Sequence, residues 1–155
     1  MIQRAFGLAV LVCLAAPLGC GGSTIAQEIA NLVPGDAVGA EHSGRYPLTI
    51  TRTAYVCRSG PIWLMHSEAT ASVEQRDGTL SVAFEYGTTF RLGGGVDTRG
   101  AFSVGEVKTV AGGKMSAYLT GSLAGGRLKG KLELNLSTNE VDCDIAATVE
   151  GARSP

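Results

Sequence analysis

Alternation of apolar and polar residues with a period of two is the feature that most constrains this chain. It begins at Tyr46 and runs almost to the C-terminus, broken by short turns that contain glycine. A period of two is typical of strands that bury one face. The 155 residues include 22 glycines and few aromatic residues, which suits many short strands and turns. We therefore predict one all-β domain over residues 46–155.

The turns fix how neighbouring strands pair. Asp77-Gly78 is a strong hairpin signal, and Gly125-Gly126 predicts a second two-residue turn. Residues 97–100 predict a three-residue loop with Gly100 in the left-handed conformation, and residues 137–140 predict a four-residue turn. The resulting pairs include Val73 with Val82, Val96 with Phe102, Leu119 with Leu132, and Leu134 with Cys143.

Pairing of this kind predicts an antiparallel meander of about eight strands. It either closes into a calycin-like barrel or divides into a two-sheet sandwich, and local pairing leaves both open. The predicted strands are Leu48–Cys57, Ile62–Gln75, Thr79–Glu85, Thr88–Val96, Ala101–Val110, Lys114–Leu123, Arg127–Leu136 and Val141–Gly151.

The predicted inner face is aliphatic and aromatic. It consists of Leu80, Val82, Phe84, Phe90, Leu92, Phe102, Val104, Leu119, Leu128, Leu132, Leu134 and Ile145. Gly94, Gly121 and Gly130 fall on the same face. Glycines there either admit close packing of strands or leave room for a small apolar ligand, and we favour the packing.

Residues 1–19 have the three zones of an export signal: a short start with Arg4, an uncharged apolar run to Leu18, and small residues after it. The run is too short for a membrane-spanning helix. Residues 20–45 then resemble a tether. Within it, Ile25, Ile29 and Leu32 have helical spacing, which predicts a short helix that ends before Pro34-Gly35 and packs on the domain.

The stretch Pro17-Leu18-Gly19-Cys20 resembles a bacterial lipoprotein signal, in which a small residue precedes an acylated cysteine; Pro17 departs from the usual pattern. The resemblance covers about the first 23 residues and implies a lipid on Cys20 followed by a Gly-Gly-Ser tether. Glycine after Cys20, in place of aspartate, implies outer-membrane sorting. The alternative is cleavage after Thr24-Ile25-Ala26, which would release a soluble periplasmic protein.

Either cleavage leaves Cys57 and Cys143 as an even pair in an oxidising compartment, so we predict a disulfide between the first and last strands. The bridge would close the meander. Cys57 shares its face with Tyr55 and Thr53, whereas Cys143 shares the apolar face with Ile145. A bulge, or a strand-end position for Cys57, would reconcile the two faces.

Candidates for chemistry are few. His42 and His66 have no metal-ligand spacing, and no nucleophile or zinc motif occurs. The predicted register sets Glu133 opposite Asp144, with Asp142 nearby, and a calcium ion could relieve that repulsion. We favour solvated surface charges, and we expect no metal and no cofactor, because calcium ligands usually come from a turn.

Two other stretches of the sequence are candidates for contacts with a partner. Trp63 lies in an apolar stretch beside Arg58, which predicts a contact site for a protein partner or a plug at one barrel end. The short basic row of Arg127, Lys129 and Lys131 has acidic neighbours. Because the mature chain is slightly acidic and has no basic block, we expect no nucleic-acid binding.

Taken together, these patterns favour a non-enzymatic binding module, held at the cell envelope through the lipid on Cys20, for a protein partner or a small apolar ligand. Two alternatives stay open. One is a soluble periplasmic ligand-binding or inhibitor-type protein, since the single bridge and the Tyr55-Val56-Cys57 strand resemble small lysozyme-inhibiting lipoproteins. The other is an enzyme with a calycin-like pocket.

Overall fold

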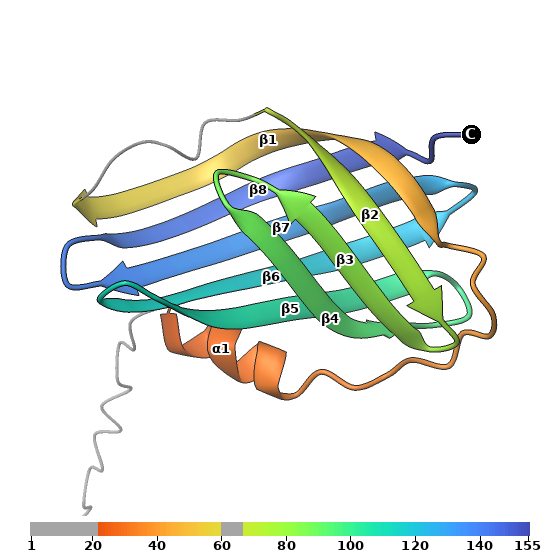
Figure 1. The fold of residues 1–155 in the computed structure, drawn as a ribbon, viewed down its shortest axis with the longest axis horizontal. Helices are drawn as coiled ribbons and strands as arrows, with labels where there is room; N and C mark the ends of the chain where they lie inside the picture. The colour runs from red at the N-terminus through yellow and green to blue at the C-terminus, as the bar shows by residue number, and fades with distance from the viewer. Residues whose placement is uncertain (1–21, 60–66) are drawn as a thin grey trace, which may run out of the picture.

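The protein is described from a computed structural model that covers residues 22–59 and 67–155. Eight antiparallel strands pair in sequence order and close into a barrel (Figure 1). The meander is thus confirmed, and the barrel is chosen over the sandwich. The strands are β1 (Gly44–Ser59), β2 (Glu68–Arg76), β3 (Thr79–Glu85), β4 (Thr89–Val96), β5 (Ala101–Val110), β6 (Gly113–Ala124), β7 (Arg127–Thr138) and β8 (Asp142–Ala152).

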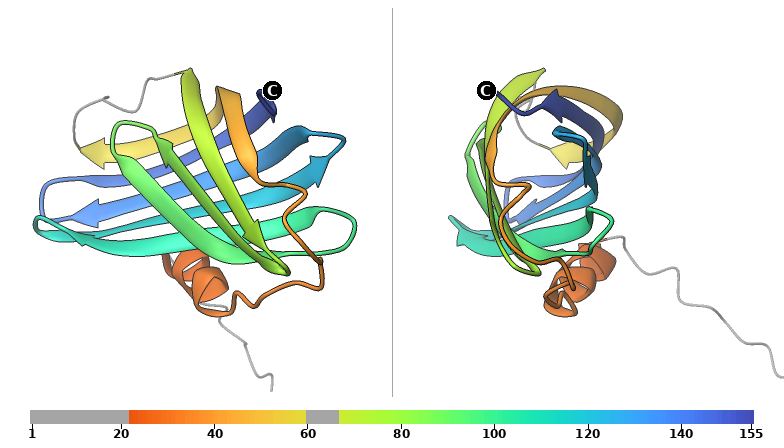
Figure 2. Two further views of the ribbon diagram at one scale, coloured as in Figure 1. Left: turned by 45° about the vertical axis from the view of Figure 1, so that its right-hand side comes forward. Right: turned by 90° about the vertical axis from the view of Figure 1, so that its right-hand side faces the viewer.

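The barrel is built from long and short strand pairings. β6 pairs with β7 along their whole lengths, whereas β4 pairs with β5 only from Gly93 to Val96. β2, β3 and β4 therefore cross over the long sheet formed by β5, β6, β7, β8 and β1 (Figures 1 and 2). We call the end with the β2–β3, β4–β5 and β6–β7 turns the closed end. The opposite end, with the β5–β6 and β7–β8 turns, is the disulfide end.

The core is the predicted inner face. Every residue of that predicted set is buried, with at most 4% of its surface exposed. Two tyrosines that the alternation did not assign to the core, Tyr46 and Tyr86, are buried with them. Alternation predicted the face correctly because a barrel strand has one apolar side and one solvated side.

The predicted turns at Asp77-Gly78, residues 97–100 and Gly125-Gly126 are present. Gly125 and Gly126 have φ of 57° and 70°, and Gly100 has φ of 80°, all left-handed values that favour glycine. The pairs across them are confirmed: Val73 with Val82, Val96 with Phe102, and Leu119 with Leu132.

The predicted register between β7 and β8 is wrong by two residues. Leu134 faces Ile145, and Cys143 faces Leu136. The cause is Thr138, whose hydroxyl accepts hydrogen bonds from the backbone N–H groups of Glu140 (3.2 Å) and Val141 (2.9 Å) and so moves the turn one residue along the chain. A slip of two residues keeps the same face inward, so the core is unchanged.

The predicted disulfide joins Cys57 of β1 to Cys143 of β8, which lie directly opposite each other with a Cα–Cα distance of 4.1 Å. The ladder shifts register between Arg52 and Ala54, and this bulge brings Cys57 onto the face of Cys143. The expected bulge is therefore present. β2 begins at Glu68, so the predicted strand start at Ile62 lies outside the described residues.

One helix, α1 (Gly22–Ala30), lies against the outer face of β5, β6 and β7 (Figure 2). The expected short helix is present, it ends before Pro34-Gly35, and it packs on the barrel. Its Ile29 side chain occupies the space over Gly105, where an added Cβ would lie 2.5 Å from Ile29 Cγ1. Gly22 and Ser23 belong to the helix, so the Gly-Gly-Ser stretch is helical from Gly22 onward.

Candidate functional site

The closed end of the barrel is sealed by the chain segment 33–43. Its backbone binds two turns: Gly35 N–H donates to Gly78 O (2.8 Å), and Ala37 N–H donates to Val96 O (3.2 Å). Side chains of the same turn regions complete the seal, because Asp77 Oδ1 accepts from Gly39 N–H at 3.0 Å. No helical or strand periodicity marks this segment, so these contacts could not be predicted from the sequence.

Gly78 and Gly95 must be glycines because the backbone of segment 33–43 comes very close to them. A Cβ on Gly78 would lie 1.8 Å from Gly35 O, and one on Gly95 would lie 2.3 Å from Val33 O. The Tyr46 hydroxyl donates to His42 O (2.9 Å) beneath this layer, and burial raises the pKa of Tyr46. The segment is therefore part of the folded barrel.

The barrel interior is filled by side chains. The three inner-face glycines do not leave room for a ligand: a Cβ on Gly94 would lie 2.1 Å from Ser103 O, and one on Gly121 would lie 2.0 Å from Lys129 O. A Cβ on Gly130 would lie 2.7 Å from Thr120 O. Close strand packing, the favoured explanation for these glycines, is what the structure shows.

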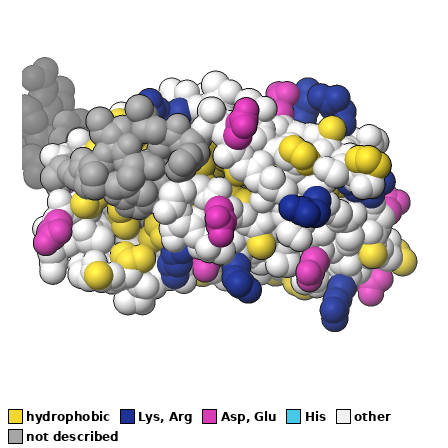
Figure 3. All heavy atoms as spheres, turned by 45° about the horizontal axis from the view of Figure 1, so that its top comes forward, with side chains coloured by type: hydrophobic (Ala, Val, Ile, Leu, Met, Phe, Trp, Pro, Cys, Tyr) yellow, Lys and Arg dark blue, Asp and Glu magenta, His cyan; other side chains and the backbone are white. Residues whose placement is uncertain are grey.

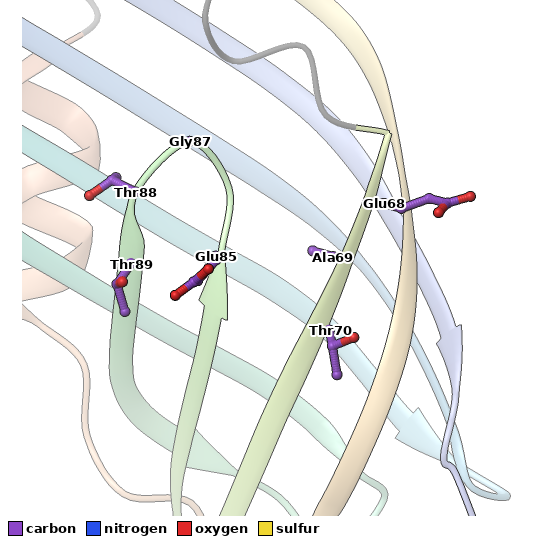
Figure 4. A pocket seen from close by; sticks show the side chains of 7 residues that line it. All are labelled: Glu68, Ala69, Thr70, Glu85, Gly87, Thr88 and Thr89. Carbon is purple, nitrogen blue, oxygen red and sulfur yellow. The ribbon is translucent and has the colours of Figure 1, made fainter.

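A pocket of about 810 Å³ opens between β2 and the β3–β4 turn, where these strands diverge beyond Ser72 and Ala83. It is lined by Glu68, Ala69, Thr70, Glu85, Gly87, Thr88 and Thr89 (Figure 4). Glu68 points away from the β3–β4 turn, so the two carboxylates do not converge. Among the described residues, the lining offers carboxylates and hydroxyls but no histidine, cysteine or lysine.

The three acidic residues considered for calcium are not brought together. Because of the corrected register, Glu133 faces Ala146, and Asp144 faces Asn135. Glu133 forms an ion pair with Lys131, and the hydrogen bond with Glu133 raises the pKa of that lysine. Asn135 Nδ2 donates to Asp144 Oδ1 at 2.8 Å.

The third acidic residue, Asp142, pairs with a basic one: its Oδ2 lies 3.7 Å from Arg58 Nη1. Within the described ranges no group of three or more His, Cys, Asp or Glu side chains could hold a metal ion. The repulsion that suggested a cation therefore does not arise.

The predicted contact residues are partly described. Arg58 lies near the end of β1 at the disulfide end with 79% of its side chain exposed. Trp63 and His66 lie outside the described residues, as do Cys20 and the export signal. On the face that Figure 3 shows, acidic and basic side chains are interspersed. Lys129 Nζ lies 4.0 Å from Glu150 Oε1.

Sequence reasoning missed a pair of charged residues where β4 and β5 diverge. Lys108 Nζ donates to Thr89 O at 2.7 Å and lies 4.8 Å from the centre of the Phe90 ring. Glu106 Oε2 accepts from Arg91 N–H at 2.9 Å. These side chains bind backbone groups of β4 where the ladder has ended. Two charges in the inward register of Phe102 and Val104 were the signal that could have found them.

Nothing in the described residues forms a helix long and apolar enough to cross a membrane. The sequence matches no protein-family model, no curated protein and no solved structure.

Proposed function

We propose that this chain is an exported, lipid-anchored and non-enzymatic binding module of the cell envelope, carried on the outer membrane by acyl groups on Cys20. The export signal, the lipoprotein-like stretch ending at Cys20 and the glycine after it support the anchor. The Cys57–Cys143 disulfide supports an oxidising compartment.

The position of α1 favours Cys20 over cleavage after Ala26. The helix runs from Gly22 to Ala30, so cleavage after Ala26 would cut it in the middle. The half-buried Ile25 would be lost, and only one turn would remain to hold Ile29 against Gly105. Processing at Cys20 leaves the whole helix on the barrel.

The observation that carries the binding proposal is the filled barrel. A calycin-like carrier needs an internal cavity for its ligand. Here the inner face is packed, and close strand contacts occupy the glycine positions. Binding then takes place at the surface, which favours a protein partner over a small apolar ligand. The sequence suggests Arg58 and Trp63 as the contact, and Arg58 is exposed near the end of β1 at the disulfide end.

The anchor is tested by the intact mass of the protein made in a bacterial host, measured on membrane and soluble fractions. We expect a membrane-bound species that starts at Cys20 and carries acyl chains. The Cys20→Ser variant is the control and should lose both the added mass and the membrane association. A soluble species that starts at Gln27 would contradict the proposal.

The partner is tested by placing a photo-crosslinking amino acid at Trp63 or Arg58 in cells that make the protein. Val38, which is 81% exposed at the closed end, is the matched control position. We expect protein adducts from Trp63 and Arg58 and none from Val38. Equal adducts from all three positions, or no adducts together with a co-purifying apolar molecule, would overturn the assignment.

A further inference from the structure

The length of chain between the proposed anchor and the barrel is very short. Only one residue separates Cys20 from Gly22, where α1 begins. An extended chain spans at most ~3.6 Å per residue, so the first helical residue lies within about 7 Å of the acylated one. An anchor at Cys20 therefore holds the start of α1 close to the bilayer surface.

The direction in which α1 runs along the barrel determines which end of the barrel lies near the anchor. The last turn of α1 lies toward the closed end, where Glu28 and Asn31 line a pocket with Gly95 and Ala101. Ile29 is fixed over Gly105, further along β5. The helix therefore runs from the disulfide end toward the closed end, and Figure 1 shows its first turn on the side of the β5–β6 hairpin tip.

The tip of that hairpin, residues 107–114, has the composition of a membrane-interface contact. Its sequence, Val-Lys-Thr-Val-Ala-Gly-Gly-Lys, contains apolar residues and two lysines but no acidic residue. Val107 is 43% exposed, one of the few large apolar side chains at the described surface, and Ala111 and Lys114 of the same hairpin are exposed as well. Apolar residues beside lysine suit the boundary between headgroups and acyl chains.

The neighbouring turn at the same end differs. The β7–β8 turn carries Glu140 and no lysine or arginine, and it is followed by Asp142, so it lacks the basic character of the β5–β6 tip. Lys108 turns back to Thr89 O, which leaves Lys114 as the lysine of the tip that faces outward. Anionic headgroups attract such a cation.

We propose that the β5–β6 hairpin tip, residues 107–114, rests on the phospholipid headgroup surface and fixes the barrel with its disulfide end toward the bilayer. The inference rests on the proposed lipid anchor, because it is the short link from Cys20 to α1 that brings the tip to the membrane. The closed end then points away from the bilayer.

Two alanines at opposite ends of β6 provide a matched test. Ala111 lies at the β5–β6 tip and Ala124 beside the β6–β7 turn, and both are exposed. In full-length acylated protein with Trp63→Phe, Ala111→Trp and Ala124→Trp each supply a single fluorophore. The proteins are reconstituted into phosphatidylcholine and phosphatidylglycerol vesicles with and without brominated acyl chains.

We expect brominated lipid to quench Ala111→Trp roughly twofold or more, because interfacial side chains lie ~5–10 Å into the headgroup boundary, and to leave Ala124→Trp unchanged. Val107→Trp and Val38→Trp form a second pair with the same expectation. Equal quenching within both pairs, or stronger quenching at Ala124 and Val38, overturns the orientation while the anchor stands. If intact mass shows no acylation, the proposed function fails first and the orientation fails with it.

Discussion

At the scale of single residues, the carboxylate of Asp97 organises the β4–β5 turn. Its Oδ1 accepts from the backbone N–H groups of Ala101 (2.8 Å) and Arg99 (2.9 Å), and its Oδ2 pairs with the Arg99 guanidinium. The hydrogen bond from Ala101, with a further contribution from Arg99, lowers the pKa of Asp97. A charged acceptor suits two converging N–H donors better than a neutral one.

Because the pKa of Asp97 is lower in the folded state, its carboxylate stabilises the barrel at neutral pH, and this contribution is lost as the pH falls through that lowered value. We expect Asp97→Asn to unfold at lower urea concentration than the wild type at pH 7. The two should converge only once the pH has fallen below the lowered pKa of Asp97 in the folded state. Asp97→Ala, which loses both acceptors, is the control and should stay less stable than wild type at every pH. A deficit in Asp97→Asn that does not change with pH would contradict this account.

The contact between Asn135 and Asp144 tests the register between β7 and β8. Asn135→Asp would set two carboxylates opposite each other and remove the donated hydrogen bond, which costs about 1–2 kcal/mol of unfolding free energy at neutral pH. Urea denaturation at pH 7 measures this loss. In the register first predicted from the sequence, Glu133 faces Asp144 instead. In that register Asn135 would face Asp142, so Asn135→Asp would be destabilising there too, and the discriminating variant is Glu133→Gln. It would stabilise the protein in the register first predicted, whereas in the observed register it removes the ion pair with Lys131 and should not stabilise the protein.

At the scale of elements, the period of two fixed which residues face inward but not how far each strand slides. The β7–β8 register is the example. Pairing Leu134 with Ile145 in place of Cys143 keeps every inner residue inward, so the alternation cannot distinguish the two registers. A hydrogen bond that the backbone N–H of Val141 donates to the Thr138 hydroxyl selects between the two registers. The polar pairs on the outer face, which depend on sliding, could not be predicted for this reason.

Packing of α1 on the barrel depends on residue 105 being a glycine, because Ile29 occupies the space that a side chain there would need. Gly105→Ala would place a methyl group 2.5 Å from the Ile29 Cγ1 position. We expect the helix to be loosened by about 1–3 kcal/mol, the usual cost of overpacking. Faster hydrogen exchange of the α1 amides measures the loss, because the helix can open without unfolding the barrel.

The double variant Gly105→Ala/Ile29→Ala is the control for that steric clash. Removing most of the Ile29 side chain relieves the contact with the new methyl group, so the two substitutions should be less than additive. Ile29→Ala alone should also loosen α1, because the apolar contact is lost. Strict additivity would show that Ile29 does not rest on Gly105.

At the scale of the whole molecule, the two ends of the barrel differ: one is sealed by segment 33–43, and the other is the end that we propose faces the bilayer. Segment 33–43 seals one end through backbone hydrogen bonds to turns distant in sequence. Such contacts have no local pattern, which is why sequence reasoning took residues 20–45 for a tether. If the disulfide end lies on the bilayer as proposed, Arg58 is near the membrane, and a partner that it contacts is itself at the membrane surface.

Closure of the whole barrel depends on the pairing of its first and last strands. The Cys57–Cys143 disulfide fastens that pairing across a sequence separation of 86 residues. A loop of this length removes conformational entropy from the unfolded chain worth about 4–5 kcal/mol. The ladder between β1 and β8 extends from Leu48 to Ser59, so the hydrogen bonds persist when the bridge is absent.

We therefore expect Cys57→Ser/Cys143→Ser to fold into the same barrel but to lose about 4 kcal/mol of unfolding free energy in urea. Its m-value should rise, because an unlinked chain exposes more surface on unfolding. Wild-type protein kept reduced is the control and should match the double variant. An unchanged midpoint would mean that the ladder closes the barrel alone, and loss of the β-sheet circular dichroism signal would mean that the bridge is required for folding.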